Sequence, residues 1–314
     1  MIGQSAAFTA LLAVLERIAV YDVPVLVEGE TGTGKELAAR AIHYGSRRRS
    51  GPFVPVNCGA IPDALIENEL FGHCRGAYTD ARGTQVGLVQ LAHGGTLFLD
   101  EVDALSPKGQ VTLLRFLQDR QYRPLGGSKA QHADVRVIAA CNTELDRLAT
   151  DRLFRPDLLY RLKIMHVRIP PLRERHGDAE LLAEHFVNVA SAQYNKAQRP
   201  IDPETLTWFR RYDWPGNVRE LENLVCREFL LADEPEIHID PPPACVNDAP
   251  LQEELSYKEA KARAIAAFET RYLSELMQRA NGCVSRAARI VRTERRHLGR
   301  LLKKYGIVHD SSRQ

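Results

Sequence analysis

The fold is decided by one short stretch of the chain, Gly29-Glu30-Thr31-Gly32-Thr33-Gly34-Lys35-Glu36. An apolar run, Val23 to Val27, precedes this stretch, and an expected helix from Leu37 to Ile42 follows it. A strand, a glycine-rich loop and a helix form the context of a phosphate-binding P-loop, because backbone N–H groups and the positive end of the helix face the phosphates. We therefore predict that these residues bind a nucleoside triphosphate, with Lys35 reaching its β- and γ-phosphates.

Glu36 departs from the common P-loop pattern, in which a serine or threonine hydroxyl at this position contacts Mg²⁺. The alternative interpretation is a glycine-rich turn that binds no ligand. The glycines and Lys35 fall at the spacing that a P-loop requires, and this spacing favours nucleotide binding.

Length and composition set broad limits on the protein. A chain of 314 residues with 44% hydrophobic residues predicts two or three domains with real cores, and a net charge of +2 identifies no partner. The six cysteines are scattered without a C-x-x-C pair, which fits free thiols in a reducing compartment. We expect no signal peptide and no membrane span, and therefore a cytoplasmic location.

A second motif lies downstream, where the apolar run Thr96 to Leu99 ends in Asp100 and Glu101. Two carboxylates after a buried strand are typical of a Walker B motif. Asp100 would hold Mg²⁺ through water, and Glu101 would polarise the water that attacks the γ-phosphorus. Acidic loop residues without a ligand are the alternative, which the upstream P-loop disfavours.

A further strand, Val135 to Ala140, leads to Asn142, which would lie beside the γ-phosphate and position the water. A simple turn-forming role for Asn142 is the alternative. Strands that alternate with helices predict a parallel α/β sheet over residues 1–170, with nucleotide at the carboxyl ends of its strands. Residues 171–240 have a helical pattern, and the proline-rich residues 241–256 read as a linker.

Residues 257–314 are predicted to form a separate helical domain with a strongly basic surface. A long helix would be followed by a short helix from Val284 to Val291 and a last helix that ends at Tyr305. This arrangement indicates a helix-turn-helix, and a solvated basic helix pair is the alternative. The candidate DNA contacts are Arg286, Arg292, Thr293, Arg295, Arg296 and Arg300.

Taken together, the motifs resemble those of the bacterial enhancer-binding proteins, which are AAA+ activators of sigma-54 RNA polymerase. The resemblance extends from Ile2 to Ile307 and includes a P-loop that ends in Lys-Glu. It implies that residues 171–240 form the small α-helical lid subdomain of an AAA+ P-loop ATPase. It implies that Asn57 links the catalytic Glu101 to the state of the nucleotide and that Asn142 is the sensor I residue. The C-terminal helices are similar to a Fis-type helix-turn-helix, which dimerises on inverted repeats.

The resemblance also assigns three arginines. Within Phe154-Arg155-Pro156-Asp157-Leu158-Leu159-Tyr160-Arg161, the two arginines match fingers that reach the nucleotide of a neighbouring subunit. In Trp214-Pro215-Gly216-Asn217-Val218-Arg219-Glu220-Leu221, Arg219 matches sensor II.

The sigma-54 contact would lie on a loop with the sequence Gly76-Ala77-Tyr78-Thr79-Asp80-Ala81. The family usually has G-A-F-T-G-A here, so Tyr78 keeps the aromatic ring and adds a hydroxyl, whereas Asp80 adds charge and removes backbone freedom. A second loop, Gly126 to His132, would support the first.

The resemblance implies an ATPase that uses ATP and Mg²⁺ and opens sigma-54 RNA polymerase complexes. It also implies a homo-oligomeric ring, a hexamer assembled from dimers, that binds double-stranded enhancer DNA with an inverted repeat. The family's usual N-terminal regulatory domain has no counterpart, which implies a separate regulatory protein or a truncated chain. A sigma-54-independent DNA-binding regulator, supported by Asp80, is one alternative. Another AAA+ remodelling enzyme, such as a helicase loader, is the other, and the Fis-like terminus argues against it.

Overall fold

The computed structural model describes residues 1–77, 83–232, 235–242, 284–291 and 295–304, together with residues 266, 269, 272, 273, 276, 277, 280 and 293. The chain divides into two compact units, residues 1–245 and residues 246–314.

The first unit contains a five-stranded sheet in the order β2-β5-β8-β1-β9, in which every neighbouring pair is parallel. The strands are β1 (Val25–Glu28), β2 (Phe53–Asn57), β5 (Thr96–Asp100), β8 (Arg136–Cys141) and β9 (Met165–Arg168). The carboxyl ends of parallel strands meet at one edge, so the P-loop, Asn57, Asp100 and Asn142 come to the same edge. The predicted parallel α/β sheet is confirmed.

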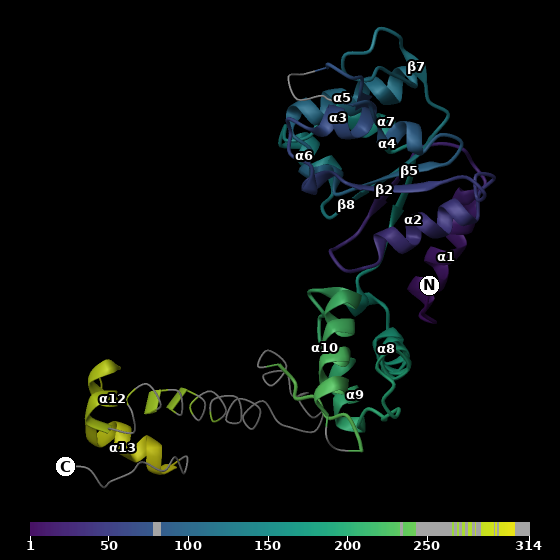
Figure 1. The fold of residues 1–314 in the computed structure, drawn as a ribbon. Helices are drawn as coiled ribbons and strands as arrows, with labels where there is room; N and C mark the ends of the chain where they lie inside the picture. Colours follow the sequence, from purple (N-terminus) through teal and green to yellow (C-terminus); the bar gives the residue numbers. More distant parts are fainter. Residues whose placement is uncertain are drawn as a thin grey trace. The chain divides into compact units, whose positions relative to one another are not determined.

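Helices cover both faces of this sheet (Figure 1). One face carries α1 (Ala6–Ala19) and α2 (Lys35–Tyr44), and the other carries α3 (Ile66–Phe71), α4 (Leu88–Leu91), α5 (Pro107–Asp119), α6 (Leu145–Thr150) and α7 (Pro156–Leu162). Local sequence starts several of these helices. The Ser5 hydroxyl caps α1 by accepting from Phe8 N, and Ser106 caps α5 directly before Pro107.

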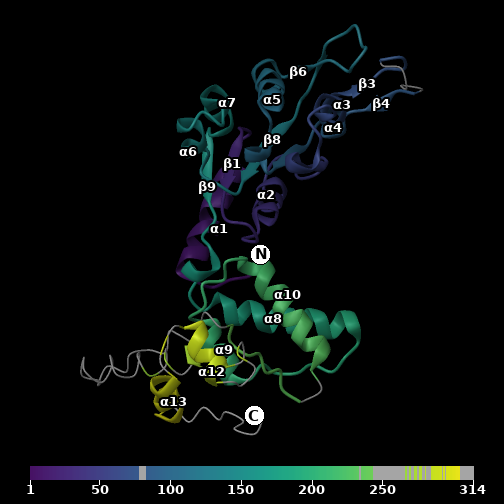
Figure 2. The same ribbon diagram turned by 90° about the vertical axis from the view of Figure 1, so that its left-hand side faces the viewer.

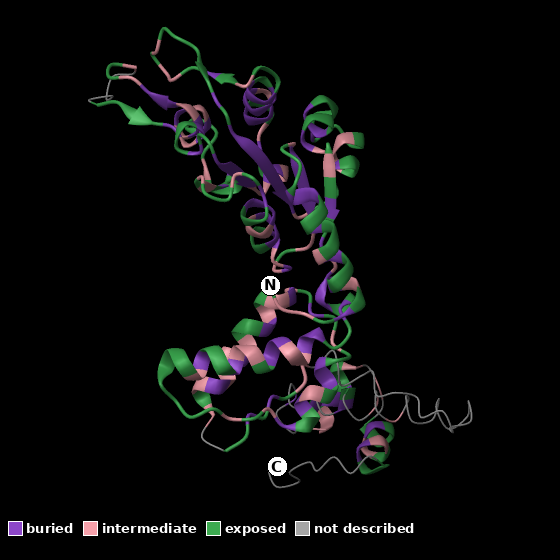
Figure 3. Ribbon diagram, turned by 90° about the vertical axis from the view of Figure 1, so that its right-hand side faces the viewer, coloured by how far each residue is buried: buried purple, intermediate pink, exposed green. Residues whose placement is uncertain are grey.

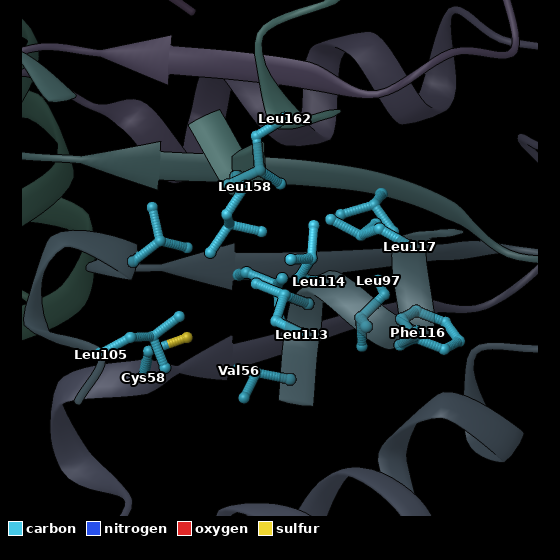
Figure 4. Packing of buried hydrophobic residues seen from close by; sticks show 14 of the residues in the cluster. Val56, Cys58, Leu97, Leu105, Leu113, Leu114, Phe116, Leu117, Leu158 and Leu162 are labelled. Carbon is cyan, nitrogen blue, oxygen red and sulfur yellow. The ribbon is translucent and has the colours of Figure 1, made fainter. Parts of the chain in front are cut away.

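The larger core lies between the sheet and helices α5 and α7 (Figure 4). Leu97 of β5 packs in one cluster with Leu113 of α5 and with Leu158 and Leu162 of α7. Each fully buried leucine contributes about 1.5–3 kcal/mol relative to an exposed one. This packing fixes the strands whose ends carry the polar residues of the candidate site.

A helical subdomain follows the sheet and includes η3 (Leu172–Glu174), α8 (Asp178–Tyr194), α9 (Pro203–Phe209) and α10 (Asn217–Leu231). Its core contains the fully buried Trp214, whose indole N–H donates to Phe209 O at 3.0 Å. Figure 3 shows that the central strands β1, β5 and β8 are buried along their length, whereas the outer faces of the helices are exposed. The predicted helical lid is confirmed.

Two small antiparallel hairpins extend from the first unit (Figure 2). β3 (Gly72–His73) pairs with β4 (Gln85–Val86), and β6 (Gln121–Tyr122) pairs with β7 (Gln131–His132). The short 3-10 helices η1 (Cys58–Ala60) and η2 (Val102–Ala104) follow β2 and β5.

In the second unit, the structure describes α12 (Val284–Ile290) and α13 (Arg295–Lys304). Leu298 and Leu302 of α13 are buried in one cluster with Ala287 and Ala288 of α12, and Leu301 packs at the edge of this cluster. Tyr305 and most of the predicted helix before α12 lie outside the described residues. Among the helices that are described, none has the length and apolar character of a membrane span.

Candidate nucleotide site

The P-loop connects β1 to α2 and adopts backbone angles that favour glycine. Gly32 and Gly34 have φ angles of 81° and 94°, in the left-handed region. The Thr33 hydroxyl donates to Glu30 O at 2.8 Å and tightens the turn. The loop therefore wraps before the N-terminus of α2, which is the arrangement required for an anion site.

Lys35 lies inside this loop and is only 8% exposed. Its ammonium donates to Gly29 O at 2.9 Å, to Glu30 O at 3.1 Å and to Asn142 Oδ1 at 2.6 Å. Burial lowers the pKa of Lys35, and the carboxylate of Asp100 opposes this effect. The ammonium is thus held by neutral acceptors that phosphate oxygens can replace.

Asn142 lies beside the P-loop, at the position expected from the sequence. In addition to its contact with Lys35, Asn142 Oδ1 accepts from the Thr31 hydroxyl at 3.3 Å. The side chain therefore bridges the end of β8 and the P-loop, so it is more than a turn-forming residue.

Asp100 and Glu101 follow β5 at the same edge of the sheet. Asp100 Oδ1 accepts from Glu101 N at 3.0 Å, and burial raises the pKa of the Asp100 carboxyl group. Glu101 has a φ angle of 54°, which is uncommon for a residue with a side chain and often occurs at functional sites.

The chemistry of these side chains fits magnesium. Mg²⁺ prefers oxygen ligands and usually keeps several waters while binding one or two carboxylates and the substrate phosphates. Asp100 supplies such a carboxylate near Lys35. Within the described part of the chain there is no cluster of three His, Cys, Asp or Glu side chains that could bind a metal without phosphates.

Asn57 ends β2, directly opposite Asp100 in the strand register. Its Oδ1 accepts from Ala60 N at 3.1 Å and so caps η1. The Glu101 carboxylate points toward the same helix, because a Cβ atom added to Gly59 would lie 2.7 Å from Glu101 Oε2. The implied link between Asn57 and Glu101 stays a prediction, since the described contact of Asn57 is with Ala60.

Arg219 is an exposed residue of α10, and this helix approaches the P-loop. The Arg219 Cβ lies 3.1 Å from the place that a Cβ on Gly32 would occupy. Arg219 and Thr31 both line a cavity of about 680 Å³, with Trp208, Tyr212 and Glu220 among the other lining residues. The predicted sensor II residue is therefore placed near the phosphate-binding loop.

Arg155 is the N-cap residue of α7 and Arg161 lies in its last turn, and both are exposed. Arg155 forms a bidentate ion pair with Asp157, with distances of 3.0 Å from Nε and 2.7 Å from Nη2. This hydrogen-bonded pairing raises the pKa of Arg155. The described ion pair of Arg155 is thus local and does not involve the P-loop of its own chain.

The base of the predicted sigma-54 loop contacts the second loop. Cys74 N donates to Leu125 O at 2.9 Å, and Leu125 N donates to Gly72 O at 2.9 Å. Ala77 packs against Gly126. The expected support is present at the base, whereas Tyr78, Thr79, Asp80 and Ala81 lie outside the described residues.

Four of the candidate DNA contacts, Arg286, Arg295, Arg296 and Arg300, lie on α12 and α13. The exposed arginines there are Arg286, Arg289, Arg295, Arg296 and Arg300, and Thr293 is half-buried. Arg292 lies outside the described residues.

Two residues at the junction with the lid have contacts that the sequence motifs did not predict. Asn217 is fully buried and has a φ angle of 52°. Arg173 forms a bidentate pair with Glu30 at 2.8 and 2.6 Å that lowers the pKa of Glu30 to about 2. The one available signal was that asparagine tolerates left-handed backbone better than most residues.

A P-loop, acidic residues after a neighbouring strand and a polar strand-end residue, all on a parallel sheet with a helical lid, define an AAA+ type ATPase domain. The chain belongs to the family of the sigma-54 interaction domain, whose model matches residues 1–168. An AAA+ ATPase lid domain model matches residues 173–258. These matches confirm the predicted membership in the sigma-54 activator family.

Curated relatives and solved structures agree with this assignment. The chain is 40% identical over 301 residues to the regulatory protein AtoC of Escherichia coli, covering 93% of this chain and 64% of AtoC. It is 48% identical over 240 residues to the phenol regulator MopR of Acinetobacter guillouiae, covering 76% of this chain and 43% of MopR. The crystal structure of NtrX from Brucella abortus has a TM-score of 0.75 and 36% identity, covering 98% of this chain and 69% of NtrX. The chain thus spans only part of the curated relatives' length.

Proposed function

We propose that the protein hydrolyses ATP and uses the energy to open promoter complexes of sigma-54 RNA polymerase. The observation that carries this proposal is the contact of Lys35 with Asn142 at the P-loop, in a chain whose first 168 residues match a sigma-54 interaction domain. An NtrX structure that is 35% identical to this chain was solved in complex with ATP, which supports the same ligand here.

The residues at the sheet edge have complementary roles in this mechanism. Lys35 leaves its carbonyl acceptors and binds the β- and γ-phosphates, while Asn142 positions the attacking water. Glu101 accepts a proton from that water. Asp100 would hold Mg²⁺, which when bound supplies positive charge to the phosphates. Arg219 contacts the phosphates from the lid.

Assembly and DNA binding complete the proposal. Subunits form a ring, a hexamer built from dimers, in which Arg155 and Arg161 reach the nucleotide of the neighbouring subunit. The C-terminal helices form a helix-turn-helix whose exposed arginines bind an inverted repeat in enhancer DNA. Hydrolysis moves the Gly76–Ala81 loop against sigma-54.

Lys35→Ala is expected to weaken ATP binding by about 10- to 100-fold, because a charged hydrogen-bond donor to the phosphates is lost. Titration with a fluorescent ATP analogue measures this change. Lys108→Ala, which removes an exposed lysine of α5, is the matched control and should bind normally. Retained affinity in Lys35→Ala would remove the P-loop assignment.

The function itself is tested with sigma-54 holoenzyme on a sigma-54 promoter, using the protein at high concentration so that specific enhancer DNA is unnecessary. We expect ATP-dependent strand opening, detected by permanganate reactivity of unpaired thymines. Tyr78→Ala should lose strand opening and keep ATP hydrolysis, because only the loop contact is removed.

Asp80 favours a second candidate function, a DNA-binding regulator that does not act on sigma-54. A charged residue at this position of the loop changes both its charge and its backbone freedom. ATP hydrolysis without strand opening would favour this candidate, and Asp80→Gly would then be expected to create strand opening.

A further inference from the structure

We propose that Asn217 is a positioning residue that locks the lid onto the P-loop and thereby places Arg219 on the nucleotide. This inference rests on the proposed nucleotide function. Asn217 is the first residue of α10 and is fully buried. Its side chain joins three segments that are far apart in the sequence.

Both the nitrogen and the oxygen of the Asn217 side-chain amide form hydrogen bonds. Nδ2 donates to Glu30 Oε2 and to Thr31 O, at 3.1 Å in each case. Oδ1 accepts from Leu172 N at 2.8 Å. One side chain therefore connects the P-loop, the segment that enters the lid, and the helix that carries Arg219.

The backbone around Asn217 is also in close contact with the P-loop. Val218 N donates to Gly32 O at 3.1 Å. A Cβ atom on Gly32 would lie only 2.2 Å from Gly216 O, so the two segments approach as closely as glycine permits. Because Arg219 follows two residues after Asn217 on α10, a displacement of Asn217 displaces Arg219 from the P-loop.

Glu30 has a second partner in this network. Its carboxylate pairs with Arg173, the residue directly after Leu172, and this pairing holds the pKa of Glu30 at about 2. Glu30 is therefore ionised near neutral pH and needs a donor at Nδ2 of Asn217. The network is specific for an amide, because only an amide offers donors to Glu30 and Thr31 and an acceptor to Leu172.

Asn217→Asp provides a sharp test, because aspartate keeps the size, the acceptor and the tolerance for left-handed backbone. It replaces the donor with a second carboxylate that faces Glu30. We expect the KM for ATP to rise by about 10- to 100-fold, as for the loss of a hydrogen bond to a charged group. Asn217→Gly, which keeps the backbone angle, should give a smaller rise because it adds no repulsion.

Two double variants separate positioning from a general structural role. Asn217→Asp combined with Glu30→Gln should reverse part of the rise in the KM, because the new amide at position 30 donates to the new carboxylate. Arg219→Ala should raise the KM in the wild-type background and add little in the Asn217→Asp background, because Arg219 is already displaced there. Additive increases in the KM from Asn217→Asp and Arg219→Ala, or a KM that Glu30→Gln does not lower, would overturn the inference.

ATP hydrolysis by the wild-type protein is measured alongside each variant. The melting temperature of each protein is measured as well. Absence of ATP hydrolysis by the wild type would overturn the proposed function, whereas wild-type hydrolysis with additive losses would overturn the positioning role alone. If Asn217→Asp fails to fold, Asn217→Gly carries the same comparison with Arg219→Ala.

Discussion

Replacing Arg155 with alanine is expected to leave ATP binding intact and to lower ATP turnover by about 10³–10⁵-fold. The reason is that an arginine finger stabilises the charge that spreads over the transferring phosphoryl group in the transition state. Phosphate release is measured at a protein concentration at which sedimentation demonstrates the ring. Normal turnover by this variant would remove Arg155 from the mechanism.

The proposal that Arg155 acts on the nucleotide of a neighbouring subunit is tested by mixing two inactive variants. Arg155→Ala keeps an intact P-loop, and Lys35→Ala keeps an intact finger, so mixed rings should regain turnover at the sites where the two meet. Arg147→Ala, which removes an exposed arginine of α6, is the matched control and should hydrolyse ATP normally. Mixed rings that stay inactive would contradict a finger that acts between subunits.

The surroundings of Arg155 suit such a finger. Arg155 N donates to Gln110 Oε1 at 2.9 Å, and the buried Gln110 also donates to Leu105 O and Leu153 O at 3.0 and 3.1 Å. The backbone is therefore fixed to α5. Among the described residues, the guanidinium pairs with the exposed Asp157. Exposed ion pairs contribute little to stability, so Arg155 can leave this partner at little cost.

The parallel sheet and the residues at its edge could be predicted because short motifs determine them. Glycine spacing defined the P-loop, and apolar runs that end in Asp100 or Asn142 placed polar groups at strand ends. Parallel pairing then brings these ends together, which accounts for the 2.6 Å contact between Lys35 and Asn142. The strand order β2-β5-β8-β1-β9 could not be predicted from spacing, because it depends on long-range packing.

The contacts that hold the lid were not predictable from local pattern. Asn217 and Glu30 are separated by 187 positions, and Asp178 and Ser5 by 173 positions. No periodicity or turn motif relates residues at such separations. The left-handed backbone of Glu101 was also missed, because local sequence favours this conformation mainly for glycine, asparagine and aspartate.

The N-terminal segment is attached to the lid by a buried ionic cluster around Asp178. Its Oδ1 accepts from Gln4 N at 2.8 Å and from Ser5 N at 2.9 Å, and its Oδ2 accepts from Arg175 Nε at 2.8 Å. Arg175 is 4% exposed, donates to Ile2 O at 3.0 Å and lies 4.3 Å above the Phe8 ring. Asp178 thus neutralises a buried cation.

Asp178→Ala is therefore expected to lower the free energy of unfolding by about 3–5 kcal/mol, since it leaves the buried charge of Arg175 without a partner. Urea denaturation of wild type and variant measures the difference. Asp157→Ala, which breaks the exposed pair with Arg155, is the control and should lower the free energy of unfolding far less than Asp178→Ala does. A similar loss of unfolding free energy in both variants would contradict the idea that burial makes the Asp178 ion pair more important than an exposed pair.

The pH dependence of this difference follows from the same cluster. Burial by itself would raise the pKa of Asp178, but hydrogen bonds from Gln4 N and Arg175 outweigh it and hold the pKa below the ordinary value of 3.8. A carboxyl group whose pKa is lower in the folded state stabilises the fold above its unfolded pKa and loses this contribution as the pH falls. The stability gap between wild type and Asp178→Ala should therefore be constant near neutral pH and should narrow below pH 3.8. A gap that does not change with pH would show that the cost of Asp178→Ala comes from lost packing, and that the ionised carboxylate contributes little to holding the N-terminal segment on the lid.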